Sequence, residues 1–330
     1  MSGPRISWAA LLAVGAFFLS FAALLRFQVY ESVLALPLEQ DRTYRLTTQR
    51  GAYFDAATLT SRTGVPLVST TTLSGDVAAG DGGTAVWIEF TSLETAEGER
   101  IDYHERRSAF DRRTGMTVAC CGQYVDEDAG VWQSGLAFRL PFRAEPRSYP
   151  MFDTVLRRSV PLRFEREEEV EGVRTYRYRY SAGPIRVENL PGTLPGEVMG
   201  LPGWRSVGVS RYVEVTRTLW VEPESGLTVK VEEVHRQALR TADEVERKVS
   251  LEAHLTMSRD DVAALAAEAG AFARWAAVVR DVLPGGSGAL GAILTALALW
   301  LRRRTGPAAQ PQEPSAAAQH EQQVPAHDLA

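Results

Sequence analysis

The sequence TYRYRY at residues 175–180 alternates strictly between two kinds of side chain. Tyr176, Tyr178 and Tyr180 fall on one face, and a threonine and two arginines fall on the other. Side chains of a β-strand point alternately to opposite faces, so a period of two indicates a strand with one buried and one solvated face. Aromatic side chains on the buried face either pack in a core or line an apolar cavity, and the alternation leaves both interpretations open.

The same pattern recurs in residues 211–221, where Val213, Val215, Leu219 and Val221 share one face. Residues 86–90 and 227–231 are further short runs with strand character. Several such runs, separated by turns, are typical of antiparallel sheets. We therefore predict a mainly β domain built from curved antiparallel sheets.

The sequence FDRRTGMTV at residues 110–118 matches VEPESGLTV at residues 221–229. Each contains an acidic residue, a polar stretch, a Thr or Ser, a Gly and then a new strand. Glycine readily takes the positive φ that tight hairpins need. The two copies lie about 110 residues apart. They predict an internal duplication, with candidate repeats over residues 40–140 and 150–257.

Residues 6–25 contain no charged side chain and are bounded by Arg5 and Arg26. An α-helix rises ~1.5 Å per residue, so a run of this length spans about 30 Å, the thickness of the hydrocarbon layer. The run is longer than the apolar part of a secretory signal, and residues 27–30 are a poor cleavage site. We predict an uncleaved transmembrane helix, with a cleaved signal as the alternative.

Residues 282–301 form a second uncharged run, which has a glycine-rich start and ends at Trp300, just before the three arginines 302–304. An interfacial Trp followed by a basic cluster marks a membrane exit on the cytoplasmic side. Small residues in such a run (Gly286, Gly288 and Gly291) favour close helix packing. We predict a second transmembrane helix and both termini in the cytoplasm. A helix lying on the membrane surface is the alternative.

A helical stalk is predicted between the β-rich domain and the second span. Ser258 followed by acidic residues is an N-cap signal, and an Ala-rich stretch continues from it. The last residues are rich in Ala, Gln and Pro and predict disorder. The predicted order is a cytoplasmic N-terminus (1–5), transmembrane helix (6–25), extracytoplasmic β-rich domain (26–257), helical stalk (258–281), second transmembrane helix (282–301) and disordered cytoplasmic tail (302–330).

Charge and composition exclude several classes of function. The 330 residues carry a net charge of −5, and residues 26–281, with 32 basic and 38 acidic side chains, carry −6. A nucleic-acid binder would normally show a basic face, so we predict no nucleic-acid partner. No nucleophile elbow, phosphate loop or Ser/His/Asp set is recognisable. The five His share no metal-ligand spacing. We therefore predict no catalytic residues, no metal and no cofactor.

Residues 183–206 contain five Gly and four Pro in 24 positions, together with several large apolar side chains. Long loops without regular structure are uncommon and often functional. An apolar loop of this kind closes over a cavity as a lid, touches the bilayer or covers the edge of the sheet. The lid interpretation, combined with the tyrosine face, gives a candidate lipid-binding set: Tyr176, Tyr178, Tyr180, Leu194, Met199, Leu201 and Trp204.

Cys120 and Cys121 are neighbours in the sequence. Both lie in the segment predicted to be outside the cytoplasm, where disulfides persist. They are a disulfide candidate or two buried thiols. A redox or metal role would need a further ligand, which the sequence does not identify.

Seven motifs, spread in order over nearly the whole chain, are specific when taken together. They are GAYFD at residues 51–55, GDVAAG at 75–80, TAVW at 84–87, FDRRTG at 110–115, CCG at 120–122, YPMFD at 149–153 and TLWVEP at 218–223. With the two apolar segments, they resemble the actinobacterial PorA-type family of membrane proteins.

The resemblance implies a cell-envelope protein with two spans and an extracytoplasmic β-rich domain. The family name implies a porin. The residues favour another function, because a membrane barrel needs strands with an apolar outer band, whereas these strands carry Arg, Glu and Pro. The hairpin at residues 219–227 also resembles those of half-barrel lipoprotein carriers, whose curved sheets hold acyl chains.

The leading functional hypothesis is a non-catalytic membrane protein whose outer domain binds or transfers a lipid or glycolipid during envelope assembly. Its partners would be that lipid and envelope-assembly membrane proteins. A pore-former is the alternative that the family name implies. A third hypothesis is a structural or regulatory scaffold without a ligand.

Overall fold

The computed structural model describes residues 7–203 and 205–304. The chain divides into two compact units, one formed by its two terminal segments, up to Phe27 and from Asp281, and the other by residues 28–280. The predicted N-terminal segment 1–5, residue Trp204 and the tail beyond residue 304 lie outside the described residues.

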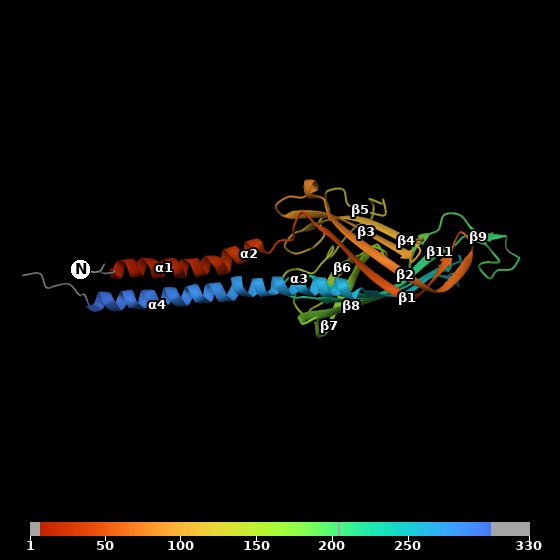
Figure 1. Cartoon of the computed structure of the whole chain (residues 1–330). Coiled ribbons are helices and arrows are strands. Elements are labelled where there is room, and N and C mark those ends of the chain that lie inside the picture. The colour runs from red at the N-terminus through yellow and green to blue at the C-terminus, as the bar shows by residue number, and fades with distance from the viewer. Residues whose placement is uncertain (1–6, 204, 305–330) are drawn as a thin grey trace, which may run out of the picture. The chain divides into compact units, whose positions relative to one another are not determined.

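The first unit is a pair of apolar helices, α1 (Trp8–Leu24) and α4 (Leu283–Arg304), which lie side by side (Figure 1). Helical residues continue from α1 through η1 (Leu25–Val29) and α2 (Tyr30–Val33), and they precede α4 in α3 (Arg259–Ala277) and η3 (Val278–Val282). Both helical runs are long and apolar enough to cross a membrane.

Glycines let α1 and α4 approach closely. A Cβ atom added to Gly15 would lie 2.9 Å from the backbone nitrogen of Thr295 and 3.0 Å from the carbonyl oxygen of Gly291. The prediction of close packing is therefore confirmed at Gly291. It is wrong at Gly286, which has open space around it.

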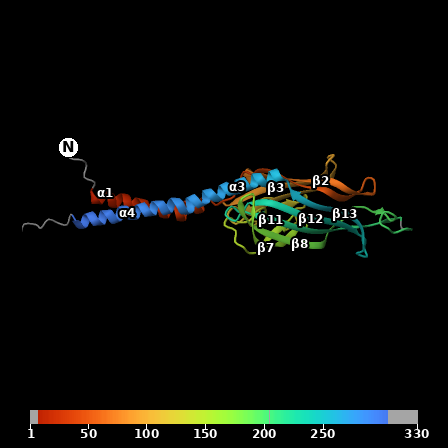
Figure 2. The same ribbon diagram turned by 60° about the horizontal axis from the view of Figure 1, so that its bottom comes forward.

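The second unit is built on one sheet of eleven strands in the order β5-β4-β3-β2-β1-β13-β12-β11-β8-β7-β6. All neighbouring strands are antiparallel. The sheet curls into a half-barrel, and Figure 2 shows its long strands from a second direction. The strands are β1 (Asp41–Asp55), β2 (Thr60–Gly75), β3 (Thr84–Thr95), β4 (Arg100–Asp111), β5 (Tyr124–Val125), β6 (Tyr149–Asp153), β7 (Arg158–Val170), β8 (Val173–Asn189), β11 (Ser210–Val221), β12 (Thr228–Arg240) and β13 (Glu246–Met257).

Strand β8 contains the TYRYRY sequence. Tyr176, Tyr178 and Tyr180 are buried, whereas Arg179 is exposed and Arg177 is half-buried. The prediction of a strand with a buried tyrosine face is confirmed. The other face is solvated at Arg179 but not at Thr175, which is buried. The mainly β, curved antiparallel fold predicted from such patterns is confirmed with it.

The two matching motifs form the same turn. The Asp111 carboxylate accepts hydrogen bonds from the backbone nitrogens of Arg113 (3.0 Å) and Thr114 (2.8 Å). The Glu222 carboxylate accepts from the equivalent nitrogens two and three residues later, at 2.9 and 2.7 Å. Gly115 and Gly226 follow with φ of 72° and 70°. The acidic side chain thus accepts hydrogen bonds from the backbone N–H groups of the turn, and the glycine supplies the left-handed backbone conformation.

The core lies on the concave side of the sheet. Buried side chains of β1, β8, β11 and β13 pack there against the irregular segment 126–148 and against one face of α3. The α3 side chains in this core are Val262, Leu265, Ala266 and Ala269. The helix begins at its N-cap, Ser258, whose hydroxyl accepts a hydrogen bond from the Asp261 backbone nitrogen at 3.1 Å.

The two ends of the strand order are joined by isolated bridges. Phe110 of β4 pairs with Thr117, the adjacent Met116 pairs with Leu136, and Leu136 pairs with Met151 of β6. The backbone nitrogen of Leu136 donates to Pro150 O at 2.8 Å, and that of Phe152 donates to Leu136 O at 3.0 Å. We call residues 115–118 and 135–137 the closing segment, because they connect the two edges of the sheet.

The convex face of the sheet is polar. Arg236 of β12 forms ion pairs with Glu214 of β11 (3.2 Å) and with Glu246 of β13. Glu252 and His254 of β13 are exposed on the same sheet. A sheet face in contact with lipid would carry apolar side chains instead. The strands are therefore built to face water on this side.

The glycine- and proline-rich stretch is only partly irregular. Its first part, Gly183–Asn189, belongs to β8, so the prediction of a loop is wrong there. The remainder contains the two-residue strands β9 (Leu194–Pro195) and β10 (Ser206–Val207), which pair in a small second sheet. The alternation of side chains along β8 is interrupted at Gly183 and Pro184, residues that are uncommon inside strands. The sequence therefore indicates that the strand ends before residue 183, although β8 continues to Asn189.

Candidate functional site

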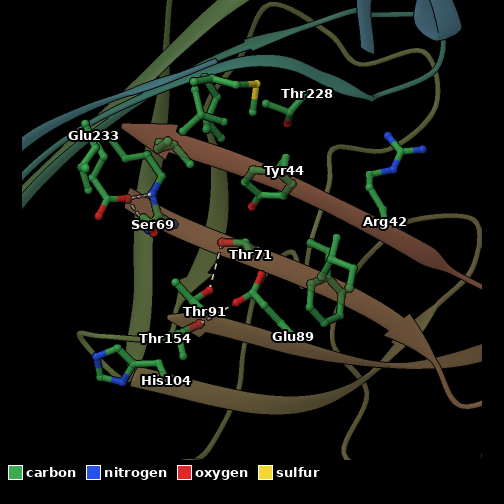
Figure 3. Close-up of a pocket in the computed structure, with 18 of the residues that line it drawn as sticks. Arg42, Tyr44, Ser69, Thr71, Glu89, Thr91, His104, Thr154, Thr228 and Glu233 are labelled. Carbon is green, nitrogen blue, oxygen red and sulfur yellow. Dashed lines mark hydrogen bonds and ion pairs between the residues drawn. The ribbon is translucent and has the colours of Figure 1, made fainter. Parts of the chain in front are cut away.

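A cavity of about 160 Å³ lies inside the curled sheet. It is lined by side chains of strands β1–β4, β6 and β11–β13, by segments 138–139 and 154–155 and by α3. Its walls are part apolar and part charged, as the close-up in Figure 3 shows. The charged and imidazole side chains in its wall are Arg42, Glu89, Asp102, His104, Arg106, Arg139, Arg217, Glu233 and His235.

His104 of β4 lies between two carboxylates. Its Nδ1 is 3.0 Å from Asp126 Oδ2, and its Nε2 is 3.6 Å from Asp102 Oδ1. Burial alone would lower the pKa of His104, but the two carboxylates outweigh burial and raise it to about 10. The imidazole is therefore a cation at neutral pH. Burial would raise the pKa of Asp102, but His104 and Arg211 hold it below its usual range.

Arg217 of β11 anchors a second group of charges. Its Nε and Nη2 donate to Glu233 Oε2 at 2.7 and 2.6 Å, and its Nη1 is 3.7 Å from Asp153 Oδ2. The Tyr180 hydroxyl also donates to Asp153. Burial would lower the pKa of Arg217, but Glu233, Tyr180 and Asp153 raise it well above its ordinary value. Arg217 is thus a permanent cation that neutralises two buried carboxylates.

A chain of polar contacts connects these two groups. Gln237 Nε2 donates to Asp102 Oδ2 at 2.7 Å and lies 3.3 Å from His235 Nε2. His235 Nδ1 in turn lies 3.5 Å from Glu233 Oε1. Burial lowers the pKa of His235, so this imidazole is neutral where His104 is charged. The network links side chains of β4, β11 and β12 across the concave face.

Arg106 of β4 forms a third ion pair in the cavity wall, with Glu89 of β3. Its Nε and Nη2 donate to the two oxygens of Glu89 at 2.9 and 3.2 Å. The Thr154 hydroxyl donates to the same carboxylate at 3.2 Å. The Arg106 guanidinium also lies over the ring of Phe138, 4.3 Å from its centroid. Its third nitrogen, Nη1, is enclosed and has no hydrogen-bond partner among the described residues.

The three tyrosines of the candidate lipid-binding set are part of the core. Tyr176, Tyr178 and Tyr180 are 9%, 0% and 3% exposed. The Tyr178 hydroxyl donates to the carbonyl oxygen of Glu145 at 2.6 Å, and its ring contacts Phe164 at 5.7 Å between centroids. None of the three is among the described residues that line the cavity.

The loop members of that set lie in a separate cluster. Met199 is buried with Val207, Val209 and Leu239, and Leu190, Leu194, Leu201 and Phe54 pack against this group. The structure therefore brings Leu194, Met199 and Leu201 together but does not join them to the tyrosines. Trp204 lies outside the described residues.

The cysteine pair forms a disulfide between Cys120 and Cys121. Cys121 is exposed, and its carbonyl oxygen accepts a hydrogen bond from Arg107 Nε at 3.1 Å. Across residues 7–203 and 205–304, no group of three or more His, Cys, Asp and Glu side chains could hold a metal ion.

The cavity charges were missed because their signal in the sequence is weak. In β4 the inner residues Asp102, His104 and Arg106 alternate with polar outer residues, so a period of two gives no contrast between the faces. Strand β11 does carry a signal. Arg217 interrupts an otherwise apolar face formed by Val213, Val215, Leu219 and Val221. A single charge on a buried face indicates a buried partner, and Glu233 is that partner.

Comparison with known proteins places this sequence in a family. The family model of Porin PorA matches residues 9–300. A Porin PorA of Corynebacterium resistens is 23% identical in a match that covers 38% of this chain and 45% of that protein. A Porin PorA of Corynebacterium amycolatum is 29% identical, over 29% and 31% of the two chains. Each pairwise match thus spans less than half of the relative's length. The family match covers nearly all of both apolar helices and the whole sheet, and the chain belongs to the Porin PorA family.

Proposed function

We propose that the chain is a pore-forming, non-catalytic protein of the cell-envelope membrane. The observation that carries the proposal is the family match over residues 9–300. The names of the two curated relatives support it, as do the two helices long enough to cross a membrane.

In this proposal the helices, and not the sheet, form the wall of the pore. A lipid-exposed barrel needs an apolar outer face and no open edge, whereas this sheet has a charged convex face. Two helices alone enclose no passage, so several α1–α4 pairs would have to surround it. Arg302–Arg304 at the end of α4 favour a cytoplasmic location for both termini. The sheet unit would then lie outside the cytoplasm, and its charged cavity would face the aqueous side.

Conductance in planar lipid bilayers tests the proposal with the purified full-length chain. We expect discrete conductance steps from the native chain. Gly15→Leu, which separates α1 from α4, should abolish them, and Ala16→Leu, at an exposed position of the same helix, should preserve them. If the folded native chain gives no steps, the pore proposal fails. Equal steps from Gly15→Leu would exclude the helix pair as the wall.

A second candidate function is binding or transfer of an envelope lipid or glycolipid. The observation that favours it is the mixed lining of the cavity, where Leu46, Leu227 and Met257 share the wall with the charged network. A ligand with an apolar chain and a polar group has the matching character. Envelope-assembly membrane proteins would be the partners that deliver or receive it.

Native mass spectrometry with lipid extraction tests this second candidate on the full-length chain from an actinobacterial host. We expect close to one lipid per chain. Leu227→Ser should lower retention if the cavity holds the lipid. The triple change of Leu194, Met199 and Leu201 to Ser should lower it if the loop cluster does. A folded chain without lipid, after exposure to total envelope lipids, would exclude the candidate.

A further inference from the structure

Arg139 lies in the cavity wall without an acidic partner. Its Nη2 donates to the backbone oxygen of Ser225, and its guanidinium lies 5.3 Å from the ring centroid of Phe142. Within the described parts of the chain, no carboxylate is paired with it at ion-pair distance. Glu268 and Glu222 act on Arg139 only from beyond ion-pair distance. An enclosed guanidinium without a direct ion pair still favours an anion supplied from elsewhere.

A second cation acts on Arg139 from β1. Burial, followed by the positive charge of Arg42, outweighs the carboxylates of Glu268 and Glu222 and lowers the pKa of Arg139 to about 10. Arg42 also lines the cavity, and its Nη2 donates to the two oxygens of Glu268 at 2.7 and 3.0 Å. In the view of Figure 3, Arg42 lies at the opposite end of the cavity from His104 and Glu233. This end is therefore the one at which two guanidinium groups act on each other.

Unused hydrogen-bond donors mark the same cavity. Arg42 Nη1, Arg106 Nη1 and Arg139 Nε are enclosed, and within the described chain none has a hydrogen-bond partner. Arg106 is only 3% exposed, so its free N–H groups are well removed from bulk solvent. Guanidinium donors match the oxygens of carboxylate and phosphate better than any other common group.

Aromatic side chains lie next to these donors. Phe138 precedes Arg139, lies under the Arg106 guanidinium and contacts Trp87 at 5.5 Å between ring centroids. Phe138 and Trp87 both line the cavity. A ligand held by the arginines would therefore meet an apolar surface within the same space.

We propose that Arg139 and Arg42, assisted by Arg106, bind an oxyanion, a phosphate or carboxylate group, whose short apolar substituent packs on Phe138 and Trp87. The site goes beyond the proposed pore and does not depend on it, since binding is measured without any conductance. Free inorganic phosphate and the polar group of an amphiphile are the two sources of this chemistry.

The test is isothermal titration calorimetry of the full-length chain in a non-ionic detergent. Butyl phosphate is the probe, because it carries both the oxyanion and a short apolar chain without partitioning strongly into micelles. Inorganic phosphate and butanol are titrated in parallel. The variants are Arg139→Met, which removes the charge, and Arg147→Met, the control. Arg147 belongs to the same segment, is 62% exposed at its side chain and already pairs with Glu145.

We expect butyl phosphate to bind the native chain and Arg147→Met equally, and Arg139→Met at least about tenfold more weakly. Weaker binding of inorganic phosphate would assign the site to an amphiphile, and equal binding would assign it to free phosphate. Either result supports the oxyanion site. The proposal is overturned if butyl phosphate does not bind, or if Arg139→Met and Arg147→Met bind it equally. It is also overturned if butanol binds as tightly as butyl phosphate.

Two further variants separate binding from folding. Arg139→Lys keeps the charge and should recover part of the affinity that Arg139→Met loses. Arg42→Met removes the second cation and should also weaken binding. If Arg139→Met does not fold, the comparison of Arg42→Met with Arg147→Met decides, and equal affinity in that pair contradicts the proposal.

Discussion

At the scale of single residues, the concave face of this sheet contains ionised groups where a small β domain would normally place apolar ones. Each of the two central cations has carboxylates on two sides: Asp102 and Asp126 for His104, and Glu233 and Asp153 for Arg217. Such pairs are costly to desolvate, and removing one partner leaves an uncompensated charge.

The first prediction concerns pH. The folded-state pKa of His104, about 10, lies above its unfolded value of about 6.5. Its contribution to the free energy of unfolding is therefore complete below pH 6.5 and is lost as the pH rises through 10. The charged groups around it are Asp102, Asp126, Arg157 and Arg211, with neutral His235 nearby.

We expect the thermal stability of the native chain to fall between pH 6.5 and pH 10, measured by tryptophan fluorescence. His104→Gln should be less stable and should lose most of this pH dependence. His254→Gln is the control, because His254 is exposed on β13. An unchanged slope in His104→Gln would show that another group controls the alkaline loss.

The second prediction compares two arginines on opposite faces of the sheet. Arg217→Met leaves Glu233 and Asp153 without their main cation, which should cost about 3–5 kcal/mol of unfolding free energy. Arg236→Met removes ion pairs of the convex face that are about one-third exposed, and should cost less than about 1 kcal/mol. Chemical denaturation measures both variants. Similar losses would contradict the assignment of Arg217 to a buried network.

At the scale of elements, the contact between α1 and α4 depends on the absence of a side chain at Gly15. A Cβ atom there would come within 3.0 Å of backbone atoms of α4, which cannot move aside independently. Glycine is therefore required for the approach of the helices and not for backbone flexibility.

The third prediction uses a cross-link between these helices. A Cβ atom at Gly288 would lie 3.9 Å from the Ala22 Cβ, within the range for a disulfide. We expect Ala22→Cys with Gly288→Cys to cross-link on oxidation, as seen by gel mobility after proteolysis between the helices. Adding Gly15→Leu should prevent the cross-link, whereas Ala16→Leu should not. Cross-linking in both backgrounds would refute the close contact.

At the scale of the whole molecule, much of the architecture could be predicted from patterns along the chain. The alternation at residues 175–180, the acidic-Gly turns and the ordered motifs predicted the curved antiparallel sheet and the family, and both are confirmed. These signals are local or depend on short spacings, so a single sequence contains them.

The cavity could not be predicted in the same way. Glu89, Asp102 and Glu233 belong to three strands, and only the strand order brings them to one space. The tyrosines of β8 were equally ambiguous, because a buried aromatic face looks the same in sequence whether it meets core side chains or a ligand. The pairing of distant strands determines whether the tyrosines meet core side chains or a ligand. The local sequence pattern contains no information about that pairing.

The fourth prediction concerns the closing segment. Isolated bridges at Leu136 protect few amides, whereas β13 is paired along its length with β12 and, at residues 251–257, also with β1. We expect hydrogen exchange in a peptide covering residues 134–140 to be faster than in one covering residues 249–257, under conditions where the chain stays folded. Mass spectrometry of the full-length chain measures both. Equal protection would show that the closing segment opens only with global unfolding.

The bridges at Leu136 give the curled sheet a seam. A sheet held at its seam by a few backbone hydrogen bonds is expected to unroll there first, because most of its neighbouring strands are joined by long ladders. The free energy that controls access to the interior is then smaller than the free energy of unfolding. It is set by the bridges at Leu136, next to Phe138 and Arg139 in the cavity wall. A partner that adds a strand along the seam would lock the interior, and one that displaces Leu136 would open it.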